Sequence, residues 1–240
     1  MLNYEIRKKE NVIIYLRDFI VYKFWNNYNL KFYIYNYLFI KKILKENIPI
    51  IYKYNFSKNH FIQKRIKNLN NFYDYDYYYI YNKVQLLHES SRVSITSLKS
   101  IKTIRHCHYN NDSVNIWDFL ITFLKFILKK RPININNHMN EYNKIISLIN
   151  DNIAHFDSKY ISFIHWDLTE KNILLSDWNY YFIDFENSWY FDCYYDYVFL
   201  YKKSEELFNK ILEKNNIVLN KVRFDVNVMI YDFLNKVYNS

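Results

Sequence analysis

The stretch "FIHWDLTEKNILLSDWNYYFIDFENSWYFDCYYD" (residues 163–196) decides how the fold of this chain is interpreted. Elsewhere the chain is mostly Lys, Asn, Ile and Tyr with scattered charges, whereas here polar side chains stand between three short apolar runs. His165 is followed by Asp167 and then by Asn172, and an Asp-Phe-Glu triplet begins at Asp184. This ordered spacing indicates a functional site at the ends of short strands.

The loop within "IHWDLTEKNILL" (residues 164–175) places Asp167 and Asn172 at its opposite ends, between two predicted strands. A hairpin of "NILLS" and "YYFID", joined by the turn "SDWN", makes Asn172 and Asp184 neighbours across its open end. Phosphoryl transfer from a nucleotide requires Mg²⁺ held by hard oxygen ligands and a carboxylate near the attacking hydroxyl. Asn172 and Asp184 are therefore predicted to bind Mg²⁺, with Asp167 close by as a base.

These motifs resemble those of the aminoglycoside phosphotransferase and choline/ethanolamine kinase superfamily, which has a protein-kinase-like fold. The match consists of His165, Asp167 and Asn172 in order, followed by "IDFE" (residues 183–186). Upstream, "VQLLHE" resembles the end of that family's first large-lobe helix, and "NIPIIYKY" and "FIQKRIKN" resemble the strand before the hinge and the hinge itself. "FIVYKF" resembles the strand that carries the nucleotide lysine, so the resemblance runs from about residue 11 to residue 199.

The resemblance implies roles for the matching residues. Asp167 would be the catalytic base, and Asn172 and Asp184 would hold Mg²⁺ against the phosphates of ATP. Lys23 would neutralise the donor phosphates as a point charge. The other implied nucleotide contacts are Lys9, Asn11, Arg65 and Ile66.

Three further residues are expected to support the catalytic loop. His165 would shape the loop, and Asp196, where the family keeps another Asp after its triplet, would accept backbone hydrogen bonds. Thr169 stands where many relatives have a basic residue or His, and Lys171 could supply that charge.

The acceptor pocket is expected just after the triplet, at Glu186, Trp189 and Asp192. Aromatic faces beside a carboxylate suit an ammonium group, which favours an amino alcohol such as choline or ethanolamine as acceptor. Asp192 fits a position of the aminoglycoside branch, so an aminoglycoside or sugar is the alternative acceptor. Packing alone also explains the aromatic cluster.

The chain departs from the family's pattern in two places. The loop that covers the phosphates is usually rich in glycine, but the corresponding turn here is "RKKEN" (residues 7–11), and the chain contains no glycine at all. In the family, a Glu on the helix of the small lobe usually pairs with the strand lysine. The position that aligns with this Glu here is the neutral Asn36. These departures leave open a second interpretation, a pseudokinase that binds nucleotide without transferring phosphate. Without glycine, backbone positions with positive φ are expected to be filled by Asn or Asp.

The hydropathy pattern predicts an α+β, two-lobed fold. Residues 1–66 would form a small β-rich lobe with one helix, and residues 67–240 a larger, mainly helical lobe. Strands are expected at residues 11–16, 19–25, 48–54, 60–66, 162–166, 172–176 and 180–185, and helices at 30–47, 81–91, 114–130, 140–156, 201–213 and 225–237.

Composition narrows the class of partner and the compartment. The formal net charge of +9 comes from dispersed lysines, which suits an anionic small ligand such as a nucleotide better than a nucleic acid. The two cysteines are too few for a disulfide framework, so a cytoplasmic protein is expected. The most apolar window, "IWDFLITFLKFIL", is broken by Asp118 and Lys125 and is too short to span a bilayer.

Overall fold

The computed structural model describes residues 5–9, 12–16, 20–25, 30–58, 60–66, 72–100, 113, 115–176 and 179–239. Within residues 5–25 the only described side chain is that of Val21, and side chains are also left out at positions 31–32, 98–100, 133, 186 and 239. Asn11 and the side chains of Lys9, Lys23 and Glu186 therefore lie outside the described part of the chain. Within that part, no helix is both long and apolar enough to cross a bilayer.

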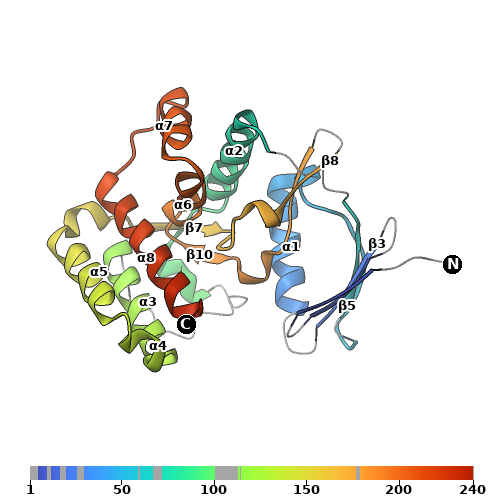
Figure 1. The fold of residues 1–240 in the computed structure, drawn as a ribbon, viewed down its shortest axis with the longest axis horizontal. Helices are drawn as coiled ribbons and strands as arrows, with labels where there is room; N and C mark the ends of the chain where they lie inside the picture. Colours follow the sequence, from blue (N-terminus) through green and yellow to red (C-terminus); the bar gives the residue numbers. More distant parts are fainter. Residues whose placement is uncertain are drawn as a thin grey trace. The chain divides into compact units, whose positions relative to one another are not determined.

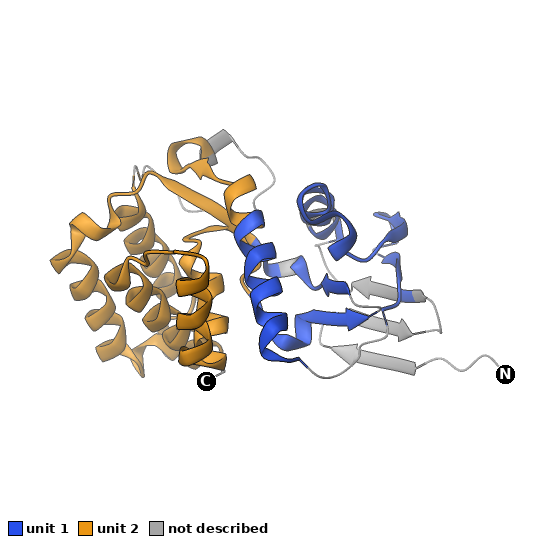
Figure 2. Cartoon of the chain, turned by 90° about the horizontal axis from the view of Figure 1, so that it is seen from above, with its two compact units in different colours: residues 1–86, 167–188 blue, residues 87–166, 189–240 orange. Residues whose placement is uncertain are grey.

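The chain folds as two compact units. Their first boundary along the chain falls after residue 86, whereas the sequence predicted a boundary between lobes after residue 66. The first unit comprises residues 1–86 and 167–188, and the second comprises residues 87–166 and 189–240 (Figure 2). The chain thus leaves the first unit, builds much of the second, and returns to the first for the stretch that carries Asp167, Asn172 and Asp184.

The first unit contains an antiparallel sheet with the strand order β1-β2-β3-β5-β4. Lys23 lies on β3, the middle strand, opposite Ile14 of β2 and Phe61 of β5. The expectation of a turn at residues 7–11 is corrected, because Lys8 and Lys9 belong to β1 and pair with Ile13 and Val12. The strands are β1 (Glu5–Lys9), β2 (Val12–Leu16), β3 (Ile20–Trp25), β4 (Ile51–Asn55) and β5 (His60–Lys64).

Helix α1 (Leu30–Leu44) follows this sheet's third strand and continues into the short 3₁₀ helix η1 (Lys45–Asn47), matching the predicted helix at 30–47. One face of α1 is apolar and buried, and each fully buried Leu or Ile there stabilises the fold by roughly 1.5–3 kcal/mol. Tyr33 stacks on Phe61 of β5 with ring centroids 5.0 Å apart, which fixes the helix against the sheet. The apolar residues of this buried face are Leu30, Tyr33, Ile34, Tyr37, Ile40 and Leu44.

Helix α2 (Asp74–Ser90) begins seven residues before the predicted start at residue 81. Its Tyr-rich first turns have little amphipathic pattern, so periodicity alone misses them. Asp74 and Asp76 lie in the first turn, where negative charge stabilises a helix. The remaining elements of the first unit are η4 (Glu170–Asn172), β8 (Ile173–Ser176), β9 (Asn179–Phe182) and η5 (Phe185–Asn187).

The second unit is mainly helical (Figure 1). It also contains a small antiparallel sheet with the order β10-β7-β6. Its strands are β6 (Val93–Ser94), β7 (Tyr160–Ile164) and β10 (Trp189–Phe191). Its helices are α3 (Ile116–Lys130), α4 (Pro132–Asn136), α5 (Met139–Asp151), α6 (Tyr194–Lys203), α7 (Glu205–Lys214) and α8 (Lys221–Asn239), with the 3₁₀ helices η2 (Ile95–Ser100) and η3 (Ile153–Phe156).

One predicted helix of this unit is divided in two. Residues 201–213 were expected to form a single helix, but α6 ends at Lys203 and α7 begins at Glu205. Ser204 lies between them in an extended conformation, and its side chain accepts a hydrogen bond from the backbone N–H of Leu207 at 3.1 Å. A serine in this position caps the start of a helix, so the break is encoded locally. The resulting α+β fold agrees with the predicted class.

Candidate active site

The hairpin of β8 and β9 brings Asn172 and Asp184 together. The strands pair in register from Ser176 opposite Asn179 to Ile173 opposite Phe182. Beyond the last pair, the backbone N–H of Ile183 donates to the carbonyl of Asn172 at 2.9 Å. Asn172 directly precedes β8 and Asp184 lies two residues after the end of β9, so both residues stand at the open end of the hairpin.

Asn172 is also bound to Asp167. Its Nδ2 donates to the backbone carbonyl of Asp167 at 2.8 Å and to the carboxylate Oδ2 of Asp167 at 3.0 Å. These two acceptors fix which atom of the amide is nitrogen, and no described residue donates a hydrogen bond to Oδ1. The amide oxygen is thus the atom left to bind a hard cation. Asn172 is buried whereas Asp167 is exposed, so a molecule in solution can reach the Asp167 carboxylate.

Asp184 adopts a left-handed backbone conformation, with φ 66° and ψ 50°. Asp tolerates this conformation better than most residue types, at a cost of about 1–2 kcal/mol relative to the right-handed one. The expectation that Asn or Asp fills positions with positive φ is met at Asp184 and also at Asn216, where φ is 53°. It fails at Lys45 and Trp166, where φ is 47° and 70°. Tertiary contacts, rather than residue type, must hold Trp166 in this conformation.

Asp196 supplies such contacts. Its buried carboxylate accepts the backbone N–H groups of His165 at 2.8 Å and Trp166 at 3.0 Å. His88 Nε2 lies 2.9 Å from the same carboxylate, so three donors surround one charge. The Trp166 ring stacks on Tyr195, with centroids 4.3 Å apart. The two residues that immediately precede Asp167 are thereby held in place.

Two tyrosine–carboxylate pairs hold other parts of the first unit, and neither pair was predicted from the sequence. The hydroxyl of Tyr77 donates to Glu170, which lies between Asp167 and Asn172, and the hydroxyl of Tyr180 donates to the buried Asp76. Burial, together with these carboxylates, raises the pKa of both tyrosines above the ordinary value of about 10. The only sequence signal for them is the Tyr- and Asp-rich start of α2, which has no helical periodicity.

The comparisons with known proteins concern the fold. No family model and no curated protein sequence matches the chain. A solved structure of a gentamicin complex of APH(2″)-IIa is 16% identical, with a TM-score of 0.63, covering 100% of this chain and 92% of the other. The GDP complex of aminoglycoside 2′-phosphotransferase-IIIa is 12% identical, with a TM-score of 0.65 and coverage of 100% and 92%. Choline kinase LicA from Streptococcus pneumoniae is 16% identical, with a TM-score of 0.62 and coverage of 99% and 85%.

The chain has the fold of these solved aminoglycoside phosphotransferase and choline kinase structures. The predicted kinase-like architecture is confirmed. At these sequence identities the similarity concerns the fold alone.

Asn36 makes contacts in this kinase-like fold that the sequence did not predict. Its Nδ2 donates to the carbonyls of Phe185 at 3.2 Å and Ser188 at 3.0 Å. Both acceptors belong to the turn that follows Asp184. The side chain of Asn36 is 7% exposed, and its amide hydrogens are directed at this turn.

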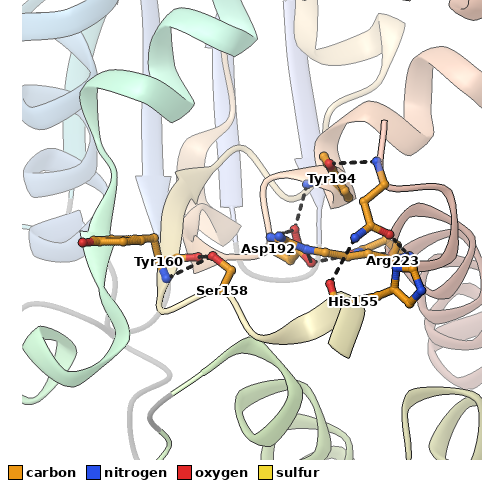
Figure 3. A network of polar contacts seen from close by, with 8 residues as sticks. His155, Ser158, Tyr160, Asp192, Tyr194 and Arg223 are labelled. Atoms are coloured by element: carbon orange, nitrogen blue, oxygen red, sulfur yellow. Dashed lines mark hydrogen bonds and ion pairs between the residues drawn. The ribbon is translucent and has the colours of Figure 1, made fainter. Parts of the chain in front are cut away.

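The residues expected to contact an acceptor are mostly buried. Asp192 is fully buried and receives the guanidinium of Arg223 through Nε at 2.7 Å and Nη2 at 2.8 Å (Figure 3). The backbone N–H of Tyr194 and the amide of Asn227 donate to the same carboxylate, at 3.1 Å and 3.0 Å. A carboxylate enclosed by four such donors has a structural role, so the expected contact of Asp192 with an acceptor has no support in the structure.

Trp189 is likewise 3% exposed and packs in an aromatic cluster in the second unit. The packing interpretation of these aromatics therefore accounts for Trp189. The cluster consists of Phe119, Phe123, Trp166, Trp189 and Phe191.

The other predicted residues are placed as follows. Arg65 and Ile66 are half-buried and directly follow β5, Lys171 is exposed within η4, and His165 is 1% exposed. Among the described residues, no three His, Cys, Asp or Glu side chains gather as a metal site. The candidate ligands predicted for a metal are therefore one amide and one carboxylate, those of Asn172 and Asp184.

Proposed function

We propose that the chain is a Mg²⁺-dependent phosphotransferase that moves the γ-phosphoryl group of ATP to a hydroxyl of a small molecule. The observation that carries this proposal is the joint placement of Asp167, Asn172 and Asp184, in which Asn172 donates to Asp167 and flanks the hairpin end beside Asp184. This arrangement occurs in a fold whose solved representatives include proteins named as aminoglycoside phosphotransferases and choline kinases.

Each residue has a role that its surroundings suit. The exposed carboxylate of Asp167 orients the acceptor hydroxyl and takes its proton as the new P–O bond forms. The oxygens of Asn172 and Asp184 are of the type that Mg²⁺ prefers, and the ion would neutralise charge on the transferring phosphates. Lys23 on the middle strand supplies positive charge to the donor phosphates, and Lys9, Asn11, Arg65 and Ile66 complete the nucleotide contacts of the proposal.

For the acceptor we propose an amino alcohol such as choline or ethanolamine, with an aminoglycoside or a sugar as the competing class. Both choices were predicted from the sequence on the basis of Trp189 and Asp192, and these two side chains are buried, so they no longer support either choice. Glu186 remains in the proposal as an acceptor contact. The acceptor panel must therefore include all three classes of hydroxyl compound.

The test is transfer of labelled γ-phosphate from ATP to this panel, with wild-type protein beside Asp167→Asn. We expect Mg²⁺-dependent transfer to at least one class and a loss of roughly 10²- to 10⁴-fold in the variant, the size of a general-base contribution. Asp74→Asn, which removes an exposed carboxylate of the same unit, is the charge-matched control. Transfer that is equal in wild type and Asp167→Asn on every acceptor contradicts the proposal.

A second function, nucleotide binding without transfer, is favoured by one observation. Helix α1 carries no acidic residue from Leu30 to Leu44, so it has no carboxylate to pair with Lys23. A thermal shift with ATP, with and without Mg²⁺, examines this case. A ligand at a hundredfold excess over its dissociation constant stabilises the protein by about 2.7 kcal/mol. Mg²⁺-dependent stabilisation that is lost in Asp184→Asn, in a protein that transfers nothing, identifies a binding module.

A further inference from the structure

Asn36 is a polar side chain whose position in the fold needs an explanation. It lies on the buried face of α1 among apolar neighbours and is 7% exposed. A buried amide without partners is costly, so such groups are found where hydrogen-bond partners await them. Both acceptors of Asn36 are backbone carbonyls of the segment that follows Asp184, at 3.2 Å from Phe185 and 3.0 Å from Ser188.

These two carbonyls bracket the short helix η5, which begins one residue after Asp184. The left-handed conformation of Asp184 turns the chain from β9 into η5. A residue in a sparsely populated conformation stays there only when its surroundings determine it. The two hydrogens of one amide, each bound to one side of the turn, provide that constraint.

The chemistry of the turn also selects the residue type at position 36. The two groups that face the side chain are carbonyl oxygens, which accept hydrogen bonds and repel a carboxylate. A Glu or Asp here would meet two acceptors without a donor of its own. An amide fits, and the absence of any carboxylate from α1 agrees with a helix that serves the turn and not Lys23.

A second asparagine holds the opposite end of the same hairpin. Asn47, at the end of η1, is fully buried, and its Nδ2 donates to Asn179 Oδ1 at 2.8 Å and to the carbonyl of Tyr180 at 2.9 Å. Asn179 and Tyr180 begin β9, next to the hairpin turn. The segment from α1 to η1 thus binds the hairpin at its turn through Asn47 and at its open end through Asn36.

We infer that Asn36 is a positioning residue for Asp184: it fixes the turn after Asp184 so that the carboxylate is held ready for a divalent cation. The metal-binding part of this inference rests on the proposed function. Asn36 acts through Asp184 and makes no contact with the nucleotide in this account.

The test uses Asn36→Asp, which keeps the shape but replaces the donor by an acceptor, and the milder Asn36→Ser in case the first variant fails to fold. Asn47→Asp and Asn47→Ser are the matched controls, because Asn47 is an equally buried amide bound to the same hairpin. The first readout is backbone amide exchange in the nucleotide-free protein. Exchange over residues 183–189 should rise about tenfold in both Asn36 variants, as expected for the loss of one or two neutral hydrogen bonds, and stay at the wild-type rate in the Asn47 variants.

The second readout is the concentration of Mn²⁺, used in place of Mg²⁺, that half-saturates the protein in the presence of ATP. We expect it to rise about tenfold in the Asn36 variants, with unchanged ATP affinity in the absence of metal, whereas the Asn47 variants lower only the melting temperature. Wild-type exchange over residues 183–189 in both Asn36 variants overturns the inference. If the wild type binds Mn²⁺ and ATP, a Mn²⁺ requirement that is unchanged in both Asn36 variants also overturns the inference.

The two readouts separate this inference from the proposed function. If the wild type binds no metal with ATP, the proposed function fails, and with it the metal-binding role of Asn36. The exchange measurement, made without nucleotide, still decides whether Asn36 fixes the turn.

Discussion

Trp166 has the least expected backbone conformation in the described chain. A bulky residue with φ 70° costs of order 1–3 kcal/mol unless its surroundings compensate. The compensation is visible in its neighbours, because Asp196 accepts its backbone N–H at 3.0 Å and Tyr195 stacks on its ring. The strained residue directly precedes Asp167, the carboxylate that we propose as the catalytic base.

Asp196→Asn tests this support. The amide keeps one oxygen but turns an NH₂ group toward backbone N–H donors, so charge-assisted hydrogen bonds from His165 and Trp166 are weakened or lost. We expect the free energy of unfolding in urea to fall by about 2–4 kcal/mol. Phosphate transfer should fall further than this stability loss explains, even at temperatures where the variant is folded. Wild-type stability and transfer would contradict the role given to Asp196.

The ion pair of Arg223 and Asp192 is expected to matter for stability because it is buried. Its side chains are 13% and 0% exposed, whereas those of Lys202 and Asp232, at the same distance of 2.7 Å, are 39% and 46% exposed. Arg223→Met leaves a buried carboxylate unpaired and should cost about 3–5 kcal/mol, measured by urea unfolding. Lys202→Met should cost less than about 1 kcal/mol. Equal losses in the two variants would show that burial does not set the contribution of this pair.

At the scale of elements, the sequence predicted most helices and strands by type but placed several of their ends wrongly. The predicted hairpin of β8 and β9 is present because two short apolar runs separated by a polar turn define it locally. Strand β1 was predicted as part of a turn, because "RKK" has no apolar pattern. Its pairing with β2 is visible only in the folded structure. The first part of helix α6, before residue 201, was missed because the run "YYDYVF" is aromatic and β-branched and does not favour a helix by itself.

The break between α6 and α7 depends on Ser204, and its cap can be tested alone. Ser204→Ala removes the acceptor for the Leu207 N–H and should lower the free energy of unfolding by about 1 kcal/mol. Ser204→Asp keeps an acceptor at the same place and adds a favourable charge at the helix start, so it should retain wild-type stability. Chemical denaturation of the three proteins side by side decides the matter. A loss in the Asp variant as large as in the Ala variant would contradict the capping role.

At the scale of the whole molecule, the motif order predicted the kinase-like fold, while the partners inside it could not be predicted. Asp167, Asn172 and Asp184 stand at loop and strand ends, where spacing along the chain fixes their proximity. The acceptors of Asn36 lie about 150 residues away from it, and the guanidinium that encloses Asp192 comes from the last helix. Such long-range pairs leave no periodic trace in a single sequence, so Asn36 was expected near Lys23 and Asp192 near an acceptor.

The buried tyrosines make the stability of the protein sensitive to alkaline pH. Burial first, and the hydrogen bond to Glu170 second, raise the pKa of Tyr77 above its value of about 10 in the unfolded chain. The stability from this shift is complete below pH 10 and is lost as the pH rises from there toward the folded pKa, because the unfolded chain ionises first. Tyr77→Phe should be less stable at pH 8 but should lose less stability between pH 9.5 and pH 11, measured by urea unfolding at each pH. A parallel decline in the two proteins would contradict this assignment.

We propose that Asn172 and Asp184 bind one divalent ion beside a nucleotide, and the binding of Mn²⁺ in place of Mg²⁺ can be measured. Electron paramagnetic resonance of Mn²⁺ with the wild-type protein and ATP should show a bound ion that is absent without nucleotide. Removing a residue that only hydrogen-bonds a metal ligand weakens metal binding by roughly 10- to 100-fold. Asp184→Ala removes a proposed ligand itself, so the dissociation constant of Mn²⁺ should rise by more than this. Asp74→Asn should bind Mn²⁺ as the wild type does. Equal Mn²⁺ binding in wild type and Asp184→Ala would contradict the proposed role of Asp184 as a metal ligand.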